Sequence, residues 1–233
     1  MIVTIDGPTA SGKSTLARML AEELHFYFLS TGLLYRALAY ILITKYTYDE
    51  GKIRNPHSDD IDEIVNYKKI IYTYDASDKE RILFDHQDIT PELKHSFIDT
   101  MSSILSTNAH VRMVLLNFQR AFAAQHDVVV EGRDTGSVVF PHADIKFFLT
   151  GSVEVRAQRW LIDQAKKGTS FSLSEAIRAI TDRDTRDKER EIAPLRVPEQ
   201  AVIIDSSALT RKQVLETMLK VIKDSKQQKK EEH

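Results

Sequence analysis

The sequence predicts an α/β fold with a central parallel sheet, and three observations carry this prediction. Helical patterns separate most of the apolar runs, which favours parallel strands joined by helices. A glycine-containing stretch, DGPTASGKST, lies at 6–15 between the first apolar run and the first helical pattern. The short apolar runs themselves are typical of buried strands and lie at 2–5, 26–29, 128–130, 145–149 and 202–204.

The helices are predicted from the spacing of their apolar residues. Leu16, Leu20 and Leu24 recur at the spacing of one helix face, so a helix follows the first strand. The last predicted helix begins after Thr210, a residue type that caps helix N-termini well. This last helix is expected at 210–223, and the other main helices at 33–45 and 108–125.

The region from residue 55 to about residue 105 interrupts the alternation and is predicted to be an inserted subdomain. Within it, apolar runs at 69–74 and 81–84 flank the polar stretch 75–78, which predicts an antiparallel hairpin. The last ten residues, 224–233, read DSKQQKKEEH and have no apolar face. We therefore expect a frayed, flexible tail there.

Composition excludes several classes of protein. The 233-residue chain has no cysteine and a formal net charge of −2, so we expect no disulfide, no thiolate zinc site and no bulk attraction to nucleic acid. The chain starts with a predicted strand instead of a signal peptide, and no apolar run approaches the roughly 18 residues of a membrane helix. The expectation is a cytoplasmic monomer that binds neither nucleic acid nor membranes.

Residues 7–14 match the phosphate-binding pattern G-x-x-x-x-G-K-[ST] in full. Its glycines let backbone N–H groups converge on phosphate oxygens, and the following helix adds its N-terminal donors and dipole. Lys13 is expected to contact the β- and γ-phosphates, and Ser14 to ligate Mg²⁺ with support from Thr15. The predicted ATP-binding residues are Gly7, Pro8, Thr9, Ala10, Ser11, Gly12, Lys13, Ser14 and Thr15. GTPases, ATPase motors and small-molecule kinases all use such a loop, so other residues must decide the class.

Two further stretches carry candidate residues for a second substrate. Thr31 and Arg36 follow the second strand, where an arginine either holds a phosphate bidentately or is an ordinary surface side chain. The strand at 128–130 ends in Glu131-Gly132-Arg133-Asp134, at the sheet edge where α/β proteins bind ligands. A strand-to-loop turn with a local ion pair is the alternative interpretation of that stretch.

The segment 156–190 is rich in arginine. Arg183 and Arg190 share one predicted helix face with acidic residues between them. This pattern indicates either a solvated, salt-bridged helix or an arginine clamp over transferring phosphates. Arg159 lies on the preceding predicted helix, and a turn at 166–168 separates the two helices, as expected of a lid.

Taken together, these blocks resemble the cytidylate kinase family of the nucleoside monophosphate kinases. The block at 132–141, GRDTGSVVFP, is specific, because it separates this family from adenylate, guanylate and shikimate kinases far better than the phosphate-binding loop does. The blocks that carry the resemblance occur in family order at 5–15, 31–36, 132–141, 143–149, 183–187, 190 and 193–195.

The resemblance implies a P-loop kinase core with a five-stranded parallel sheet flanked by helices, a small inserted subdomain at 55–105 that binds the monophosphate, and a short arginine-rich lid at 156–190. It implies Mg²⁺-dependent transfer of the ATP γ-phosphoryl group to CMP or dCMP. The implied catalytic residues are Lys13, Arg159, Arg183 and Arg190. The implied CMP-binding residues are Thr31, Arg36, Ser103, Arg112, Arg133, Asp134 and Asp187, and the implied metal ligands are Ser14 and Glu131.

Base choice and the alternatives depend on a few positions. In the family's binding pose a carboxylate such as Asp134 accepts from the cytosine amino group and Arg112 donates to the ring, whereas uracil turns a carbonyl towards the carboxylate. The chain departs from the family pattern at 86–87, at Lys94 and at Thr31, which bears on sugar preference and subdomain geometry. The main alternative is a kinase for another acceptor, such as UMP, AMP or shikimate. A GTPase would need a guanine-binding N-K-x-D motif, which this sequence does not contain. A P-loop motor or binding module is the third alternative.

Overall fold

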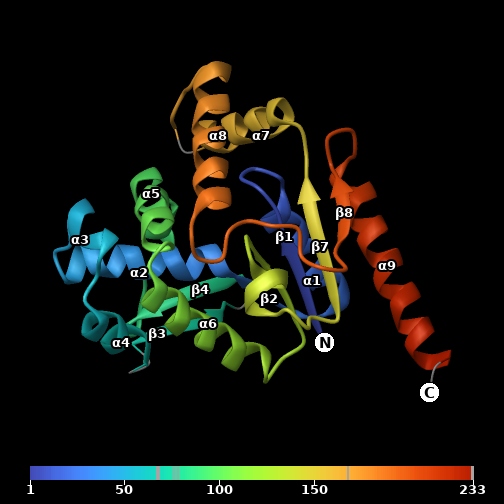
Figure 1. Ribbon diagram of the computed structural model, residues 1–233, viewed down its shortest axis with the longest axis horizontal. Coiled ribbons are helices and arrows are strands. Elements are labelled where there is room, and N and C mark those ends of the chain that lie inside the picture. The colour runs from blue at the N-terminus through green and yellow to red at the C-terminus, as the bar shows by residue number, and fades with distance from the viewer. Residues whose placement is uncertain (67–68, 76, 78, 167, 232–233) are drawn as a thin grey trace. The chain divides into compact units, whose positions relative to one another are not determined.

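The computed structural model describes residues 1–66, 69–75, 77, 79–166 and 168–231 (Figure 1). The chain divides into two compact units. The first unit comprises Met1–Phe28 together with His126–His233, and the second comprises Leu29–Gln125.

A five-stranded sheet with the order β2-β6-β1-β7-β8 forms the centre of the fold. β1 pairs in parallel with β6 on one side and β7 on the other, and β7 pairs in parallel with β8. The register sets Asp6 beside Gly132, so the polar ends of β1 and β6 meet at the carboxyl edge. Every predicted strand is confirmed, with ends moved by one or two residues: β1 (Ile2–Asp6), β2 (Tyr27–Ser30), β6 (Val128–Gly132), β7 (Ile145–Thr150) and β8 (Val202–Asp205).

In the first unit, helices α1 and α9 cover the sheet. Leu20 of α1 and Met218 of α9 are buried in one cluster with Phe147 of β7. Helices α7 and α8 pack against each other around a smaller cluster that includes Ile180. A single π-helical turn, η2, follows β6. The bounds are α1 (Lys13–Leu24), η2 (Thr135–Val139), α7 (Val153–Ala165), α8 (Leu173–Glu189) and α9 (Arg211–Glu231).

Helix α9 confirms one expectation and corrects another. Thr210 caps it as predicted, because its Oγ1 accepts a hydrogen bond of 3.3 Å from the Gln213 N–H. The frayed tail expected from residue 224 differs from the structure, in which α9 continues to Glu231. No glycine or proline interrupts 211–231, and its lysines, glutamines and glutamates are good helix formers. Residues 232–233 of the predicted tail lie outside the described residues.

The second unit combines helices with a small antiparallel sheet. The predicted hairpin is confirmed as β3 paired with β4, while positions 76 and 78 of its predicted turn lie outside the described residues. Asp85 and His86 have φ values of 46° and 66°, so a left-handed turn leads from β4 into β5. The bounds are α2 (Thr31–Lys45), α3 (Glu50–Arg54), α4 (Ser58–Asn66), β3 (Ile70–Tyr74), β4 (Glu80–Phe84), β5 (Gln87–Asp88), η1 (Thr90–Lys94), α5 (Ser96–Leu105) and α6 (Ala109–Ala123).

Candidate functional site

The loop between β1 and α1 has the backbone of a phosphate-binding loop. A Cβ atom on Gly7 would lie 2.1 Å from the carbonyl oxygen of Leu149, so only glycine allows this close approach to β7. Gly12, with a φ of 92°, is the N-cap residue of α1. The unsatisfied N–H groups and the dipole at the start of α1 therefore follow directly on the loop, which suits an anion.

Lys13 is the first residue of α1 and is buried. Its ammonium donates a 3.0 Å hydrogen bond to the carbonyl oxygen of Pro8. Burial, followed by the charge of Arg133, lowers the pKa of Lys13 to about 7, although Glu131 acts in the opposite direction. A phosphate group would relieve this penalty because it brings negative charge to a buried cation. Ser14, the predicted metal ligand, is exposed at the next position.

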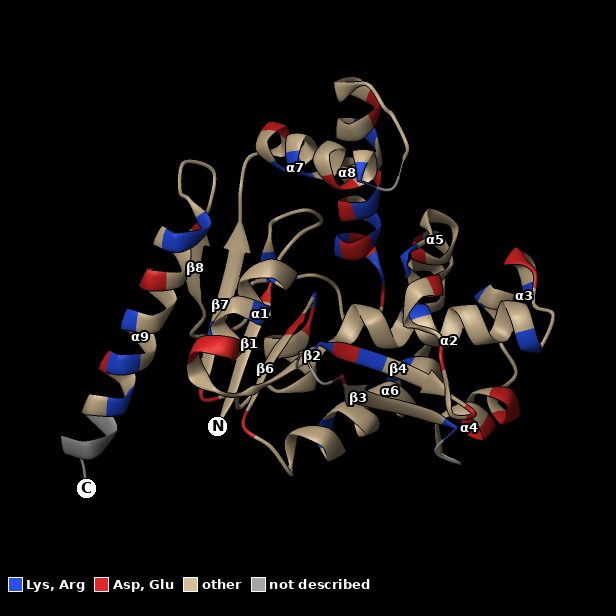
Figure 2. Ribbon diagram, turned by 180° about the vertical axis from the view of Figure 1, so that it is seen from behind, with Lys and Arg blue, Asp and Glu red and all other residues tan. Residues whose placement is uncertain are grey.

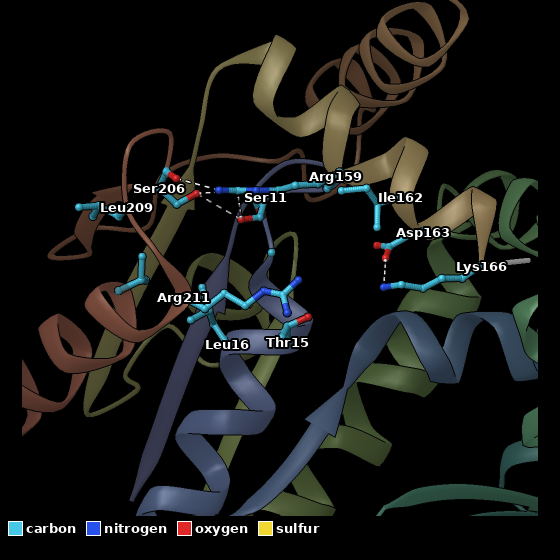
Figure 3. A pocket seen from close by; sticks show the side chains of 13 residues that line it. Ser11, Thr15, Leu16, Arg159, Ile162, Asp163, Lys166, Ser206, Leu209 and Arg211 are labelled. Carbon is cyan, nitrogen blue, oxygen red and sulfur yellow. Dashed lines mark hydrogen bonds and ion pairs between the residues drawn. The ribbon is translucent and has the colours of Figure 1, made fainter. Parts of the chain in front are cut away.

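A pocket of about 200 Å³ adjoins the loop (Figure 3). Arg159 of α7 donates hydrogen bonds to the Ser11 carbonyl oxygen at 3.1 Å and to the Ser206 carbonyl oxygen and Oγ, both at 2.8 Å. The apolar side chains of Ile162 and Leu209 line the same pocket. The structure thus places Arg159 beside the phosphate-binding loop, while its catalytic role stays a prediction.

Sequence analysis missed the residues that follow β8. Ser206 is buried next to the loop, and Leu209 and Arg211 line the pocket. A signal existed, since Ser206 lies two residues after the last predicted strand, at the same carboxyl edge as Glu131.

Four charged residues predicted for the site form a cluster of ion pairs, in which both carboxylates are buried. Arg133 donates from Nε to Asp187 Oδ2 at 2.8 Å, and from its second terminal nitrogen to Thr9 Oγ1 at 3.3 Å. Arg190 donates to Asp134 Oδ1 at 3.0 Å. Burial opposes ionisation of Asp187, but the charges of Arg133 and then Arg183 outweigh it, so the net effect lowers the pKa of that carboxyl.

A second buried ion pair binds the phosphate-binding loop to α7 and α8. Asp184 of α8 accepts a 2.8 Å hydrogen bond from the Thr9 N–H and pairs with Arg156 of α7. Arg156 also donates to the carbonyl oxygens of Thr9, at 2.9 Å, and of Gly151, at 3.0 Å. Figure 2 shows basic and acidic residues interleaved along α8. Asp184 and Asp187 are 6% exposed, so the interpretation of α8 as a wholly solvated, salt-bridged helix is wrong.

The second unit holds the other predicted CMP-binding residues. Arg36 on α2 forms an ion pair with Asp99 of α5, so it is more than a free surface side chain. Arg112 is buried, donates to the Ser106 carbonyl oxygen at 3.1 Å, and lies over the Tyr35 ring. The remaining two are Thr31, which is buried at the start of α2, and Ser103, which is half-buried on α5.

Two features are absent from the described residues. Across the parts of the chain that the structure describes, no three His, Asp, Glu or Cys side chains are grouped as a metal cage would require. Within those same parts, no helix is long and apolar enough to span a membrane.

The parallel sheet, the phosphate-binding loop that follows β1 and the buried arginines around it define a P-loop kinase. The sequence model of the cytidylate kinase family matches residues 3–224, and the chain belongs to this family. The chain is therefore a nucleotide-dependent kinase, and the resemblance found in its sequence motifs is confirmed.

Relatives span nearly the whole chain. It is 36% identical over 224 residues to the cytidylate kinase of Citrifermentans bemidjiense, with 96% of this chain and 93% of the relative covered. It is 39% identical over 222 residues to the cytidylate kinase of Thermodesulfovibrio yellowstonii, covering 95% and 97%. The crystal structure of an uncharacterized protein from Eubacterium ventriosum matches with a TM-score of 0.52, covering 96% of this chain and 98% of that one. At 12% identity, this last match bears on the fold alone.

Proposed function

We propose that this protein transfers the γ-phosphoryl group of Mg²⁺-ATP to CMP or dCMP, giving ADP and CDP or dCDP. The observation that carries the proposal is the position of Arg133. Its guanidinium bonds both to Thr9 in the phosphate-binding loop and to Asp187 on α8. The group that would grip the acceptor phosphate is thereby attached to the loop that would hold the donor, as in-line transfer requires.

The donor ATP would occupy the loop and its adjoining pocket. Lys13 would bind the β- and γ-phosphates, together with loop residues 7–15. The pocket beside Arg159 combines a guanidinium with the apolar side chains of Ile162 and Leu209, which suits a flat nucleoside base. Because Arg159 already bonds to the loop, it would order the pocket as well as contribute charge.

Mg²⁺ fits the oxygen donors that the loop and β6 provide. Ser14 supplies an exposed hydroxyl, and Glu131 a buried carboxylate near the charges of Lys13 and Arg133. Mg²⁺ usually takes only one or two protein oxygens and completes its shell with water and phosphate, so it needs no all-protein cage. When bound it would neutralise charge on the β- and γ-phosphates.

The acceptor would contact arginines through its phosphate and carboxylates through its base and sugar. Arg133 would hold its phosphate, and Arg183 and Arg190 would stabilise the transferring group without a covalent intermediate. Asp134 and Asp187 would read the base and sugar. Thr31, Arg36, Ser103 and Arg112 are proposed as further CMP-binding residues of the second unit.

The test is ADP formation from Mg²⁺-ATP with CMP, dCMP, UMP, AMP, GMP or shikimate, one at a time. We expect CMP and dCMP to exceed the others in kcat/KM by about tenfold or more, equivalent to roughly 1.4 kcal/mol. A different preferred acceptor would contradict the proposed substrate, and ADP formation that no acceptor stimulates would contradict the proposed reaction. A monomeric state and a cytoplasmic location are proposed as well, the first to be checked by light scattering.

A further inference from the structure

Asp6, the last residue of β1, is fully buried and has an unusual set of partners. Its carboxylate accepts three hydrogen bonds: from the Thr135 N–H at 2.8 Å, the Thr135 Oγ1 at 2.7 Å and the Gly136 N–H at 2.7 Å. The two donor residues begin η2 and come directly after Arg133 and Asp134. The residue that leads into the phosphate-binding loop therefore holds the segment that carries the proposed acceptor-binding residues.

Keeping the Asp6 carboxylate ionised in this buried position costs free energy that an apolar side chain would not cost. Burial raises the pKa of Asp6 to about 6, against the effect of its three hydrogen bonds, so the ionised carboxylate is maintained at neutral pH at a penalty. Replacing buried charges by well-packed apolar groups is often neutral or stabilising. What the carboxylate provides instead is three short charge-assisted hydrogen bonds that fix one loop geometry.

Gly136 supplies an independent observation of the same contact. A Cβ atom at this position would lie 2.7 Å from Thr4 Oγ1, 3.1 Å from Pro198 Cγ and 3.3 Å from Asp6 Oδ2. The backbone of η2 is therefore pressed against β1 more closely than any residue with a side chain allows. The position of the loop is determined at the strand, in addition to the ion pairs further along it.

We propose that Asp6 is a positioning residue for acceptor binding: by holding Thr135 and Gly136 against β1, it sets the placement of Arg133 and Asp134 relative to the donor loop. This inference rests on the proposed function, which assigns those two residues to the acceptor. Loss of the contact should weaken CMP binding and the discrimination against UMP, while ATP binding should remain, because residues 7–15 keep their own bonds.

The main test variant is Thr135→Val, which removes one of the three hydrogen bonds, preserves the shape of the side chain and leaves both N–H donors in place. We expect the KM for CMP and the calorimetric Kd for CMP to rise about 3- to 10-fold. The CMP-to-UMP ratio of kcat/KM should fall to a similar extent, and the KM for ATP should stay within about 2-fold. Thr135→Ser keeps the hydroxyl and should restore the wild-type values.

Two further variants complete the set. Asp6→Asn turns one acceptor oxygen into a donor that faces an N–H group, so a larger loss of CMP affinity is expected, above about 10-fold. Thr217→Val is the matched control, because it removes a threonine hydroxyl whose hydrogen bond among the described residues goes to the Gln213 carbonyl oxygen of α9. It should change neither substrate constant, and Tm is recorded for all variants.

The outcomes separate the inference from the proposed function. If Thr135→Val lowers Tm but leaves CMP binding and the CMP-to-UMP ratio within 2-fold of wild type, Asp6 is purely structural and the inference is overturned. The inference is also overturned if Thr135→Val raises the KM for ATP as much as the KM for CMP. A wild-type protein that phosphorylates a different acceptor contradicts the proposed function, and the inference is then decided by the KM for that acceptor. If Asp6→Asn fails to fold, the comparison of Thr135→Val with Thr135→Ser decides the inference.

Discussion

Removing one member of the buried ion pair between Arg156 and Asp184 should be among the most destabilising single changes in the first unit, because the other charge is left buried. Both residues are 6% exposed, and Arg156 also bonds to the carbonyl oxygens of Thr9 and Gly151. Replacing Arg156 by methionine would leave the Asp184 carboxylate buried with the Thr9 N–H as its remaining hydrogen-bond donor among those described. Breaking such a pair from one side costs about 3–5 kcal/mol. For a chain of this length that corresponds to roughly 6–20 °C in Tm.

The assay is equilibrium urea unfolding of Arg156→Met, Asp184→Asn and the double variant. Because the single variants each leave one buried partner unsatisfied, the double variant should be less destabilised than the sum of the two, by about 1–3 kcal/mol. The control is Lys212→Met, which breaks an exposed i,i+4 pair with Glu216 whose side chains are 85% and 59% exposed. It should change the unfolding free energy by less than about 0.5 kcal/mol.

ATP binding should also depend on this ion pair, since both Arg156 and Asp184 bond to the backbone of Thr9 in the phosphate-binding loop. We expect Arg156→Met to lose ATP affinity at temperatures where it is fully folded, and Lys212→Met to keep it. A coupling energy below about 0.5 kcal/mol together with unchanged ATP affinity would show that the loop holds its shape without this pair, which refutes the reasoning.

Four further predictions concern the site. Lys13→Ala should remove most turnover and leave the fold intact, as judged by circular dichroism; turnover near the wild-type level would contradict the assignment of the loop. Arg183→Ala should lower kcat more than it raises the KM for CMP, because its charge acts mainly in the transition state, whereas a change confined to KM would make it an acceptor-binding residue. Asp134→Asn should reduce the preference for CMP over UMP, and an unchanged ratio of kcat/KM would place base recognition elsewhere. The pKa of Asp6 is about 6 in the folded chain and 3.8 as its ordinary value, so the native state binds more protons between these values. Relative to Asp6→Asn, the wild type should therefore gain stability as pH falls from 7 towards 4, by at most about 3 kcal/mol in urea unfolding, and a pH-independent difference would disprove the shift.

The predictable parts of this fold are those encoded locally. Each strand is a continuous apolar run, and the phosphate-binding loop is a contiguous motif, so both could be recognised from neighbouring residues alone. Partner choice among charges was not predictable in this way. Spacing along α8 could not show that Asp187 accepts a hydrogen bond from Arg133, which lies 54 positions away in the chain. Such pairs depend on which strand ends and helices the fold brings together.

The pocket and the end of α9 show two further limits. Ser206 joins the pocket with Arg159 from a separate segment, and no motif connects the two positions in the sequence. The absence of an apolar face after residue 223 predicts a tail, but α9 continues to Glu231. Good helix formers favour this continuation, and the Lys226 ammonium lies over the Phe26 ring, 5.8 Å from its centroid.

The three polar groups of Thr9 have a consequence for anyone who exchanges parts between P-loop proteins. The motif treats this position as free, yet here its N–H bonds to Asp184, its carbonyl oxygen to Arg156 and its hydroxyl to Arg133. If the phosphate-binding loop of this chain were transferred to another protein, it would lose those distant partners. If the loop of another protein were inserted here, its backbone would have to satisfy the hydrogen bonds of two buried charged side chains, Arg156 and Asp184. In this protein the exchangeable module is the loop together with Arg156 and Asp184, even though well over a hundred residues of chain separate them from it.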